Sequence, residues 1–522
     1  MLRQLVTTAI LVLSATAILA DEMSSSAALS DIALARKTLE TIHPGYDRYT
    51  DKAVLDATWA ALEQFARGGI ERAELYVQLS ILLGLIRCDH TLAELPADMA
   101  KARDTERVYL PFRFKLFDGR MYVDTSGDAA LVRGEEILSI DGPPVSRWLF
   151  LLEPLIPVDG DTNHAKAGVI EYSTEFMGGA LDHFGPMLTP LVSRNRARLE
   201  VRGLDGELRT IVVDRIDYVA YQALTGEKRY SRNFRDAIRF ETLGDDAAYL
   251  AVDTFVNYRV PVDPVVHLEP YFKAMREEGG TKLIVDVRKN GGGSNDAQTA
   301  LLRYLINKPV LQTDGLLTRF TSIPESIRPH LGTWDAAALN PKPDWFEPAD
   351  DGFYRFVAGP APVPVDPLPY AFDGDIVVLI GSGNASGVTH MLANLATHGG
   401  IRFVGEKTGG APTGATANVI YFLTLPESGI VIRVPAQRTL IAGRDALPER
   451  DGLPPDVAVE QTAEHWFAGR DRTLEVAKQA LGLQPGPASV GEPRSDLDLA
   501  VQRSMYRALV RDLDEPQPLG FR

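Results

Sequence analysis

Apolar side chains recur at helical spacing through the first part of the chain. Between residues 28 and 42, Leu29, Ile32 and Leu39 lie three and seven positions apart, the spacing that places side chains on one face of a helix. Two further stretches repeat the pattern before residue 100. We therefore predict a small N-terminal helical domain over residues 25–100.

Short runs of β-forming residues follow, separated by turn signals. Two Asp-Gly pairs, beginning at Asp118 and Asp205, each join two such runs, and pairs of this kind favour tight hairpin turns. Residues 158–193 interrupt the pattern and are expected to form a helical insertion. The pattern predicts a β-rich domain over residues 105–217.

From residue 238 onwards, apolar strands alternate with amphipathic helices. Several strand candidates are continuously apolar, as the buried strands of a layered sheet must be. Two later runs, residues 418–425 and 429–435, are counted among these strands. A Pro- and Gly-rich segment then predicts a C-terminal tail over residues 483–522. The fold class is α/β, with a core over 238–482 and helices over 265–278, 295–306, 387–398 and 462–482.

The N-terminal segment has the composition of a secretory signal peptide. Arg3 precedes an apolar run that ends at Leu19, and polar text follows Ala20. This run of about 15 residues is shorter than the roughly 20 needed to span a bilayer, which argues against a membrane anchor. We interpret residues 1–20 as a signal peptide, cut after Ala20 or Ala17. The protein is expected to be periplasmic or secreted, with no membrane span after signal removal.

Charge and composition exclude several function classes. The 522 residues carry a formal net charge of −16, which would repel phosphate backbones and argues against nucleic-acid binding. Cys88 is the only cysteine, so no disulfide can form within one chain. The 9 histidines are scattered, with no H-E-x-x-H motif. We predict no metal site and no cofactor, and nothing in the sequence indicates an oligomeric state.

Ser386 lies where an apolar strand and a turn of small residues lead into an amphipathic helix. Its hydroxyl would be exposed beside free helical N–H groups and the positive end of the helix dipole, which suits a nucleophile that generates an oxyanion. A serine in such a place is also a common helix N-cap. Gly383 lies three residues before Ser386, so the text is not the G-x-S-x-G nucleophile elbow. Both interpretations of Ser386 stay open on this segment alone.

A second glycine-rich turn follows the strand that contains Asp286. Asn290 precedes three glycines, residues 291–293, and then a helix. Consecutive glycines allow positive φ and a close approach of the backbone to a ligand. No Gly-Lys-Ser/Thr follows, which excludes a phosphate-binding P-loop. The turn predicts a second oxyanion donor, with a plain strand–helix turn as the alternative.

Four motifs occur in the order found in one peptidase family. They are DVRKNGGG (residues 286–293), the strand, turn and helix around Ser386, FVGEKTGG (403–410) and DGLPPDVAV (451–459). Together they resemble the carboxyl-terminal processing (tail-specific) and tricorn-type serine peptidases. The resemblance extends over residues 25–482. It implies a ClpP/crotonase-like layered catalytic core, a PDZ-like fold for the β-rich domain, and serine peptidase activity.

That family uses either a Ser–Lys dyad or a Ser–His–Glu relay. The lysine position of the dyad is occupied here by Ala411, and the residue directly after the serine is Gly387 instead of glutamate. Lys407 stands at a variable position of the motif and is expected to face elsewhere. These departures favour the tricorn-like relay, with Ser386 as the nucleophile.

The resemblance implies His90 as the general base of the relay. Residues 86–91 resemble the family's L-x-D-x-H-[TS] text, with Cys88 in the aspartate place. A neutral histidine would take the proton of Ser386 and return it to the leaving amine. His390, one helical turn after Ser386, is a rival base. Cys88 is a rival nucleophile, although lone cysteines are usually buried and inert.

Two positions compete for the acid that orients the histidine. Glu449 matches the position of the glutamate in tricorn-type members, with Asp451 as its nearby rival. Asp89 stands where those members carry a serine, and could itself orient His90. The oxyanion donors would be the backbone N–H of Gly387 and that of Gly293 or Gly292.

These expectations define a leading function and two alternatives. The leading one is an endopeptidase that cleaves exported peptides or unfolded proteins through an acyl-enzyme on Ser386, with the PDZ-like domain holding a C-terminus or an extended strand. A non-catalytic ligand- or peptide-binding protein on the same fold is the first alternative, because the dyad lysine is absent. An esterase or amidase is the second, because it would use the same acyl-transfer groups.

Overall fold

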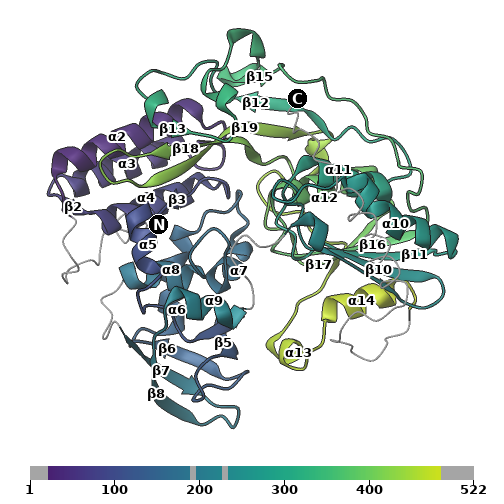
Figure 1. Ribbon diagram of the computed structural model, residues 1–522, viewed down its shortest axis with the longest axis horizontal. Coiled ribbons are helices and arrows are strands. Elements are labelled where there is room, and N and C mark those ends of the chain that lie inside the picture. The colour runs from purple at the N-terminus through teal and green to yellow at the C-terminus, as the bar shows by residue number, and fades with distance from the viewer. Residues whose placement is uncertain (1–21, 189–194, 226–232, 484–522) are drawn as a thin grey trace, which may run out of the picture.

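The computed structural model describes residues 22–188, 195–225 and 233–483. They form a mixed α/β molecule with a six-stranded, a seven-stranded and a five-stranded sheet (Figure 1). The predicted signal peptide, residues 1–20, lies outside the described residues, as does all but the first residue of the predicted tail, 483–522. No helix in the described ranges is both long and apolar enough to cross a membrane.

Helices make up the N-terminal part of the molecule. The side chain of Ser24 accepts the N–H of Ala27 at 3.2 Å and begins the first helix. Ile32 and Leu39, from the predicted apolar face, are fully buried. The third helix ends at Arg87, whose left-handed conformation (φ 60°, ψ 47°) turns the chain out of the helix. The elements are α2 (Ser25–Ile42), α3 (Lys52–Ala66), α4 (Arg72–Ile86) and α5 (Ala97–Arg103), with a short strand pair, β1 (Glu22–Met23) and β2 (Ile70–Glu71).

The five-stranded sheet is antiparallel, in the order β4-β5-β6-β7-β8. Both predicted Asp-Gly turns are present, and Asp118 adopts a φ of 51° between β4 and β5. The strands are β4 (Phe112–Phe117), β5 (Arg120–Ser126), β6 (Glu136–Ile140), β7 (Arg196–Arg202) and β8 (Leu208–Asp214). The helices of this part are α6 (Val145–Leu152), α7 (Lys166–Glu171), α8 (Ala180–Leu188) and α9 (Tyr218–Thr225).

The six-stranded sheet has the order β20-β17-β16-β11-β10-β9, and only β9 runs antiparallel to its neighbour. Apolar contacts place α10, α11 and α12 on one face and α14 on the other (Figure 1). The strands are β9 (Ile238–Thr242), β10 (Ala247–Val252), β11 (Lys282–Asp286), β16 (Asp375–Ile380), β17 (Arg402–Gly405) and β20 (Val457–Ala458). The helices are α10 (Pro264–Glu277), α11 (Asn295–Leu305), α12 (Ser386–His398), α13 (Ala463–Phe467) and α14 (Arg472–Ala480).

One predicted helix is divided. Residues 462–482 form α13 and α14 instead of one continuous helix. Gly469 lies between them with a φ of 68°, a left-handed conformation that ends a helix. Asp471 then accepts the N–H of Leu474 at 3.0 Å and begins α14.

The two apolar runs at 418–425 and 429–435 do not belong to the core sheet. They form the hairpin of β18 (Thr416–Thr424) and β19 (Val431–Ile441), which belongs to the seven-stranded sheet. Periodicity alone cannot assign a strand to one sheet or another, and the partners here come from distant parts of the chain. The other strands are β3 (Ala93–Glu94), β12 (Thr313–Thr318), β13 (Leu331–Gly332), β14 (Phe346–Pro348) and β15 (Tyr354–Phe356).

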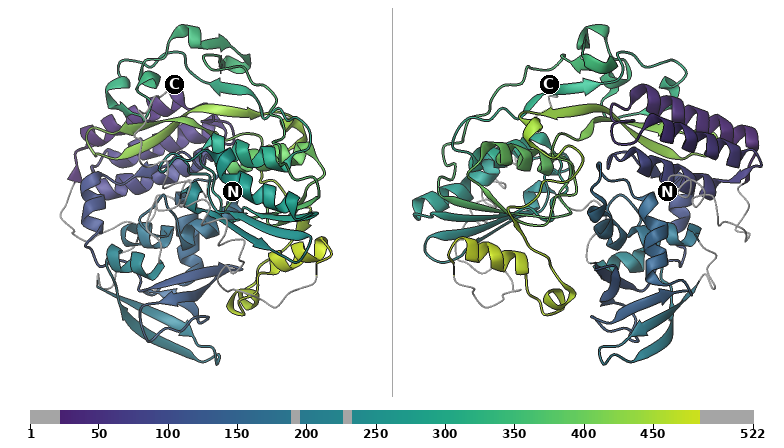
Figure 2. Two further views of the ribbon diagram at one scale, coloured as in Figure 1. Left: turned by 45° about the vertical axis from the view of Figure 1, so that its right-hand side comes forward. Right: turned by 180° about the vertical axis from the view of Figure 1, so that it is seen from behind.

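This hairpin links the helical part to the core. Ile432 of β19 pairs with Ala93 of β3, and the N–H of Arg433 donates to Leu92 at 2.9 Å. Both views in Figure 2 show the green hairpin alongside the purple helices. One apolar cluster runs from α2–α4 through the five-stranded sheet to this hairpin. The segment just before β3, which contains His90, is therefore held at the edge of the core.

Candidate active site

Two turns meet at the carboxyl edge of the core sheet. β11 and β16 are neighbouring parallel strands, so the turns that follow them lie side by side. The side chain of Asn384 donates to the carbonyls of Val287 and Asn290, which joins the two turns. Asn290 in turn donates to Val252 at 3.0 Å. Both asparagines are fully buried, and they fix the backbone from which Ser386 emerges.

Ser386 is the first residue of α12 and has a φ of 54°. A non-glycine residue in this left-handed region is strained, and such strain is found where the surrounding structure fixes a functional side chain. Because the sequence lacks the G-x-S-x-G motif, we expected no nucleophile elbow. The backbone nevertheless makes a strained turn between strand and helix. The conformation favours a nucleophile over a simple N-cap, and the N-cap position of α12 is occupied by Ala385 instead of Ser386.

His90 and Ser386 come together although they are 296 positions apart. His90 Nε2 lies 3.1 Å from Ser386 Oγ, within the distance over which a base can take the hydroxyl proton. His90 follows the left-handed Arg87, in a turn closed by the N–H of Thr91 on the carbonyl of Cys88 at 3.0 Å. The structure thus places the predicted base beside the predicted nucleophile.

His43, from the His-Pro-Gly text after α2, supports the turn that contains His90. Its Nδ1 accepts the N–H of Gly45 at 3.0 Å, so its Nε2 is the donor to Thr91 Oγ1, 2.7 Å away. The ring is fully buried, and this burial lowers the pKa of His43 to about 3. A permanently neutral His43 anchors the residue next to His90, a role that sequence reasoning did not assign.

Asp89 is the acid in contact with His90. One carboxylate oxygen of Asp89 pairs with His90 Nδ1, on the ring side opposite Ser386. Burial alone would lower the pKa of His90, but the charge and hydrogen bonding of Asp89 raise it well above 6.5. Burial conversely favours a neutral Asp89, but the His90 charge and hydrogen bonds to the carboxylate lower its pKa. Base and acid therefore stabilise each other's charged forms.

Glu449 and Asp451 are placed differently from Asp89. The Glu449 side chain is exposed, and among the described residues no hydrogen bond or ion pair joins it to His90. Asp451 instead pairs with Lys407 at 2.6 Å. Of the candidate acids, the structure therefore favours Asp89, and a catalytic role for Glu449 stays a prediction.

The glycine turn contributes backbone close to Ser386. A Cβ on Gly292 would lie 2.8 Å from the backbone nitrogen of Gly387, so the two turns are in contact. The N–H of Gly292 is already donated to Asn290 Oδ1 at 2.8 Å. No hydrogen bond from the N–H of Gly293 or Gly387 is found within the described residues. The geometry favours Gly387 and Gly293 over Gly292 as the oxyanion donors.

His390, the rival base, and the residues at the dyad motif are not available for catalysis. His390 Nε2 accepts the N–H of Ala415 at 3.1 Å, and burial lowers the pKa of His390 to about 4. His390 is therefore a neutral structural side chain with one nitrogen occupied. Ala411 is buried, and Lys407, which is exposed, is paired with Asp451. Neither His390 nor Lys407 is therefore placed to compete with His90.

Cys88, Asp89 and His90 form the one grouping, within the described ranges, whose ligand atoms are close enough to hold a metal ion, all within 4.8 Å. Burial raises the pKa of the Cys88 thiol, and its Sγ faces the carbonyl of Thr416 at 3.6 Å. A protonated thiol is a poor nucleophile and a poor ligand. Both His90 nitrogens already face Asp89 and Ser386, so the arrangement fits proton transfer better than metal binding.

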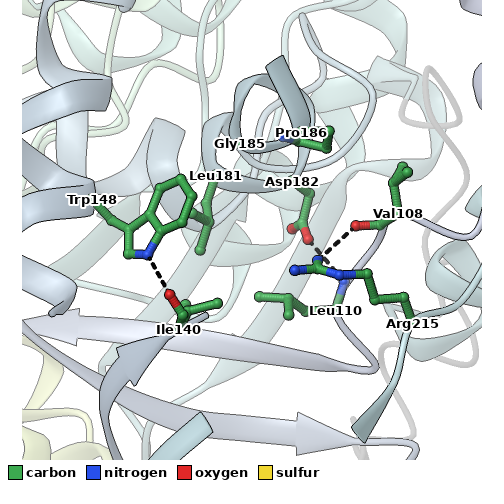
Figure 3. Close-up of a pocket in the computed structure, with 9 residues that line it drawn as sticks. All are labelled: Val108, Leu110, Ile140, Trp148, Leu181, Asp182, Gly185, Pro186 and Arg215. Atoms are coloured by element: carbon green, nitrogen blue, oxygen red, sulfur yellow. Dashed lines mark hydrogen bonds between the residues drawn. The ribbon is translucent and has the colours of Figure 1, made fainter. Parts of the chain in front are cut away.

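A separate small cavity lies in the part that contains the five-stranded sheet (Figure 3). Trp148 and Leu181 line it on one side, with Asp182 and Arg215 on the other. Asp182 accepts the N–H of Leu110 at 3.2 Å, and burial raises the pKa of Asp182 to about 6. The residues that line this cavity are distinct from those around Ser386.

Comparison with known proteins identifies the core. Residues 246–459 match the sequence model of peptidase family S41. The chain carries an S41 peptidase domain. Family S41 is a family of serine peptidases, so this domain is of the serine peptidase type. The matched S41 segment contains Ser386 and both glycine-rich turns, whereas His90 lies outside it.

Solved structures show how far the fold extends beyond that domain. Mature CPAF aligns with a TM-score of 0.59 at 16% identity, covering 90% of this chain and 99% of that chain. Mature CPAF complexed with lactacystin aligns with a TM-score of 0.58 at 16% identity, covering 88% and 97%. At this identity the likeness shows a shared fold. A search of curated protein sequences finds no match.

Proposed function

We propose that this S41 peptidase cleaves exported peptides or unfolded proteins through an acyl-enzyme on Ser386. The contact of Ser386 Oγ with His90 Nε2 at 3.1 Å carries the proposal. It joins a strained serine at a helix N-terminus to a histidine whose other nitrogen contacts Asp89. This is the arrangement of nucleophile, base and orienting acid that acyl transfer requires.

The chemistry follows from these positions. His90 Nε2 takes the Ser386 proton as Oγ bonds to the scissile carbonyl carbon, and the Gly387 and Gly293 N–H groups stabilise the oxyanion. The His90 proton then passes to the leaving amine as the C–N bond breaks, which leaves an ester on Ser386. Water gives a proton to His90 and attacks the ester carbonyl carbon. The bond to Oγ then breaks, His90 returns the proton to Ser386, and the acid is released. Asp89 stabilises the imidazolium present in both halves of the cycle.

The proposed substrate class rests on two sequence predictions, the signal peptide and the PDZ-like domain. A signal peptide over residues 1–20 would bring the enzyme to peptides outside the cytoplasm. We propose that the five-stranded part, residues 105–217, is PDZ-like and holds a C-terminus or an extended strand at a sheet edge. We likewise propose that the core over 238–482 is of the ClpP/crotonase type, behind an N-terminal helical domain over 25–100.

Cleavage of an unfolded protein tests this function directly. Purified wild type, Ser386→Ala and Ser382→Ala are compared on casein and on a quenched fluorescent peptide. Ser382 lies in the same turn, and its side chain makes no hydrogen bond to the described residues, so it controls for loss of a hydroxyl there. We expect cleavage by wild type and Ser382→Ala only. Equal cleavage by Ser386→Ala would falsify the proposal.

A fluorophosphonate probe separates the peptidase from the two alternatives. A nucleophilic Ser386 forms a covalent adduct that tryptic mass spectrometry locates. Absence of any adduct, together with a tightly held ligand, would favour a binding protein. An adduct on Ser386 without peptide cleavage, but with ester hydrolysis, would favour an esterase or amidase.

A further inference from the structure

A loop far from the S41 domain in sequence reaches the back of the active site. Residues 158–165, named here the bridging loop, follow α6 and one short helical turn (Glu153–Leu155) and end in a second (Asn163–Ala165). The N–H of Gly160 donates to the carbonyl of Arg87 at 3.0 Å, just before the turn that contains His90. Asp161 pairs with both Arg87 and Arg450. The loop thereby connects the His90 turn to the core.

The bridging loop also contacts the core at two backbone positions. The N–H of Asp161 donates to the carbonyl of Arg450 at 2.6 Å, and His164 Nε2 donates to the carbonyl of Thr408 at 3.0 Å. Gly160 has a φ of 56°, and a Cβ there would lie 2.3 Å from the carbonyl oxygen of Arg450. Only a glycine fits this close approach. The position of the loop relative to His90 is thus fixed from both sides.

Asp159, in this loop, points at Asp89. The Asp159 residue is 4% exposed, and its Oδ1 accepts the backbone N–H of Asp89 at 3.2 Å. The other Asp159 oxygen, Oδ2, is buried without a hydrogen-bond partner among the described residues, and the charge of Asp89 acts on this carboxyl group. Two ionised carboxylates in buried contact repel strongly, so one of them must hold a proton.

The surroundings decide which carboxyl group keeps the proton. Asp89 contacts His90 directly, and this cation stabilises a negative Asp89. Asp159 faces Asp89, His90, Cys88 and Tyr49, and none of these gives its carboxylate a direct cationic partner. Burial, followed by the charge of Asp89, raises the pKa of Asp159 to about 8. At neutral pH the neutral acid is therefore Asp159.

We propose that Asp159 is a positioning residue of the active site, whose protonated carboxyl group donates a hydrogen bond to Asp89 and holds it against His90 Nδ1. Its other oxygen fixes the backbone of the same residue through the Asp89 N–H. No proton is transferred between the two acids in the reaction cycle. The inference rests on the proposed function of the Ser386–His90 pair and adds a residue that neither the motifs nor the S41 match includes.

The proposal predicts a particular response to pH. Loss of the Asp159 proton removes the hydrogen bond that orients Asp89, and the added negative charge holds the His90 proton more tightly. Both effects oppose catalysis, so kcat/KM of the wild type should decline as pH rises above about 8. In Asp159→Asn the amide donates to Asp89 and its oxygen accepts the Asp89 N–H at every pH. This variant should lack the alkaline decline.

The test compares Asp159→Asn with Asp159→Leu, which has a similar size but no polar group. At pH 7 we expect Asp159→Asn to keep kcat within about threefold of wild type, and Asp159→Leu to lose on the order of tenfold or more, as when a group that orients an active-site ligand is removed. The pH profile of kcat/KM is then measured for wild type and Asp159→Asn. Retention of the alkaline decline in Asp159→Asn, or an Asp159→Asn as impaired as Asp159→Leu, would overturn the proposal.

A readout without turnover separates this inference from the proposed function. His90 is followed by NMR in protein labelled with ¹⁵N-histidine, in the Ser386→Ala background. With Asp159 present, the His90 signal should show a second inflection near pH 8, which Asp159→Asn abolishes. If wild type neither cleaves peptide nor reacts with fluorophosphonate, the proposed function fails while this titration still decides the Asp159 pairing. The same inflection in both proteins would refute the pairing alone, and the result does not depend on the fold of Asp159→Leu.

Discussion

His90 can accept the Ser386 proton only while its Nε2 is unprotonated. The sequence suggests a neutral histidine poised near pH 7, but contact with Asp89 raises the His90 pKa well above 6.5. Asp89 thus favours the imidazolium form of the resting ring. Activity should rise with pH as the ring loses its proton, and the acid limb should lie above the range of an ordinary histidine.

Replacement of Asp89 tests this charge distribution. Removing its negative charge lowers the His90 pKa, so the acid limb of kcat/KM in Asp89→Asn should move to lower pH. Loss of the orienting carboxylate should at the same time lower kcat by roughly 10²- to 10⁴-fold. The measurement is the pH profile of peptide cleavage from about pH 5 to 10, which reports the pKa of the free enzyme.

Glu449→Gln is the matched variant for that experiment. Because the Glu449 side chain is exposed and makes no contact with His90 among the described residues, its effect on kcat should be smaller than that of Asp89→Asn. If the acid limb of the kcat/KM profile moves in Glu449→Gln and stays in place in Asp89→Asn, the orienting role belongs to Glu449.

At the scale of elements, the hairpin of β18 and β19 holds His90 close to Ser386. Its tip is held by Asp31 of α2, a fully buried side chain that accepts the N–H groups of Glu427 and Ser428 at 3.1 and 2.8 Å. Its strand β19 pairs with β3, three residues after His90. The helical part is thereby docked on the core through β19, which extends from the core to pair with β3.

Asp31→Ala should loosen this docking. The change leaves two buried N–H groups without an acceptor, and hydrogen bonds to charged groups are each worth about 1.5–3 kcal/mol. We expect the free energy of unfolding in urea to fall by about 2–4 kcal/mol. Glu325→Gln removes an acid whose side chain is 84% exposed and should change it by less than about 1 kcal/mol. Equal stability of the two variants would contradict the role of Asp31.

The hairpin also shows where sequence patterns reach their limit. The runs at 418–425 and 429–435 are recognisable as strands, because β-forming apolar residues cluster there. Their sheet depends on partners such as β3, more than 300 residues earlier, which no local periodicity encodes. The divided helix at 462–482 could have been anticipated from Gly469, whose left-handed φ interrupts it.

Across the whole molecule, the site is assembled from three separate regions of sequence. Ser386 and its glycine turn could be found because motif residues surround them, and His90 because a motif resemblance reaches that far. Asp159 gave no signal, since a single aspartate in an irregular loop resembles any surface acid until the fold buries it against Asp89. The strained φ of Ser386 likewise arises from the packing of two turns.

Export is a property of the whole chain and has a simple test. If residues 1–20 are a signal peptide, the chain expressed in a bacterium with a periplasm should be recovered outside the cytoplasm. N-terminal sequencing should then give Asp21 as the first residue, or Ile18 if cleavage follows Ala17. An intact Met1 on cytoplasmic protein would exclude the signal.

The pairing of His90 with Ser386 is tested most directly by the rate of fluorophosphonate labelling. Wild type and His90→Ala are incubated with the probe above the His90 pKa, and the adduct on Ser386 is quantified by mass spectrometry. Without its base, Ser386 should be labelled at a rate lower by on the order of 10²-fold or more. A His90→Ala protein that labels at the wild-type rate would show that Ser386 is activated by another group.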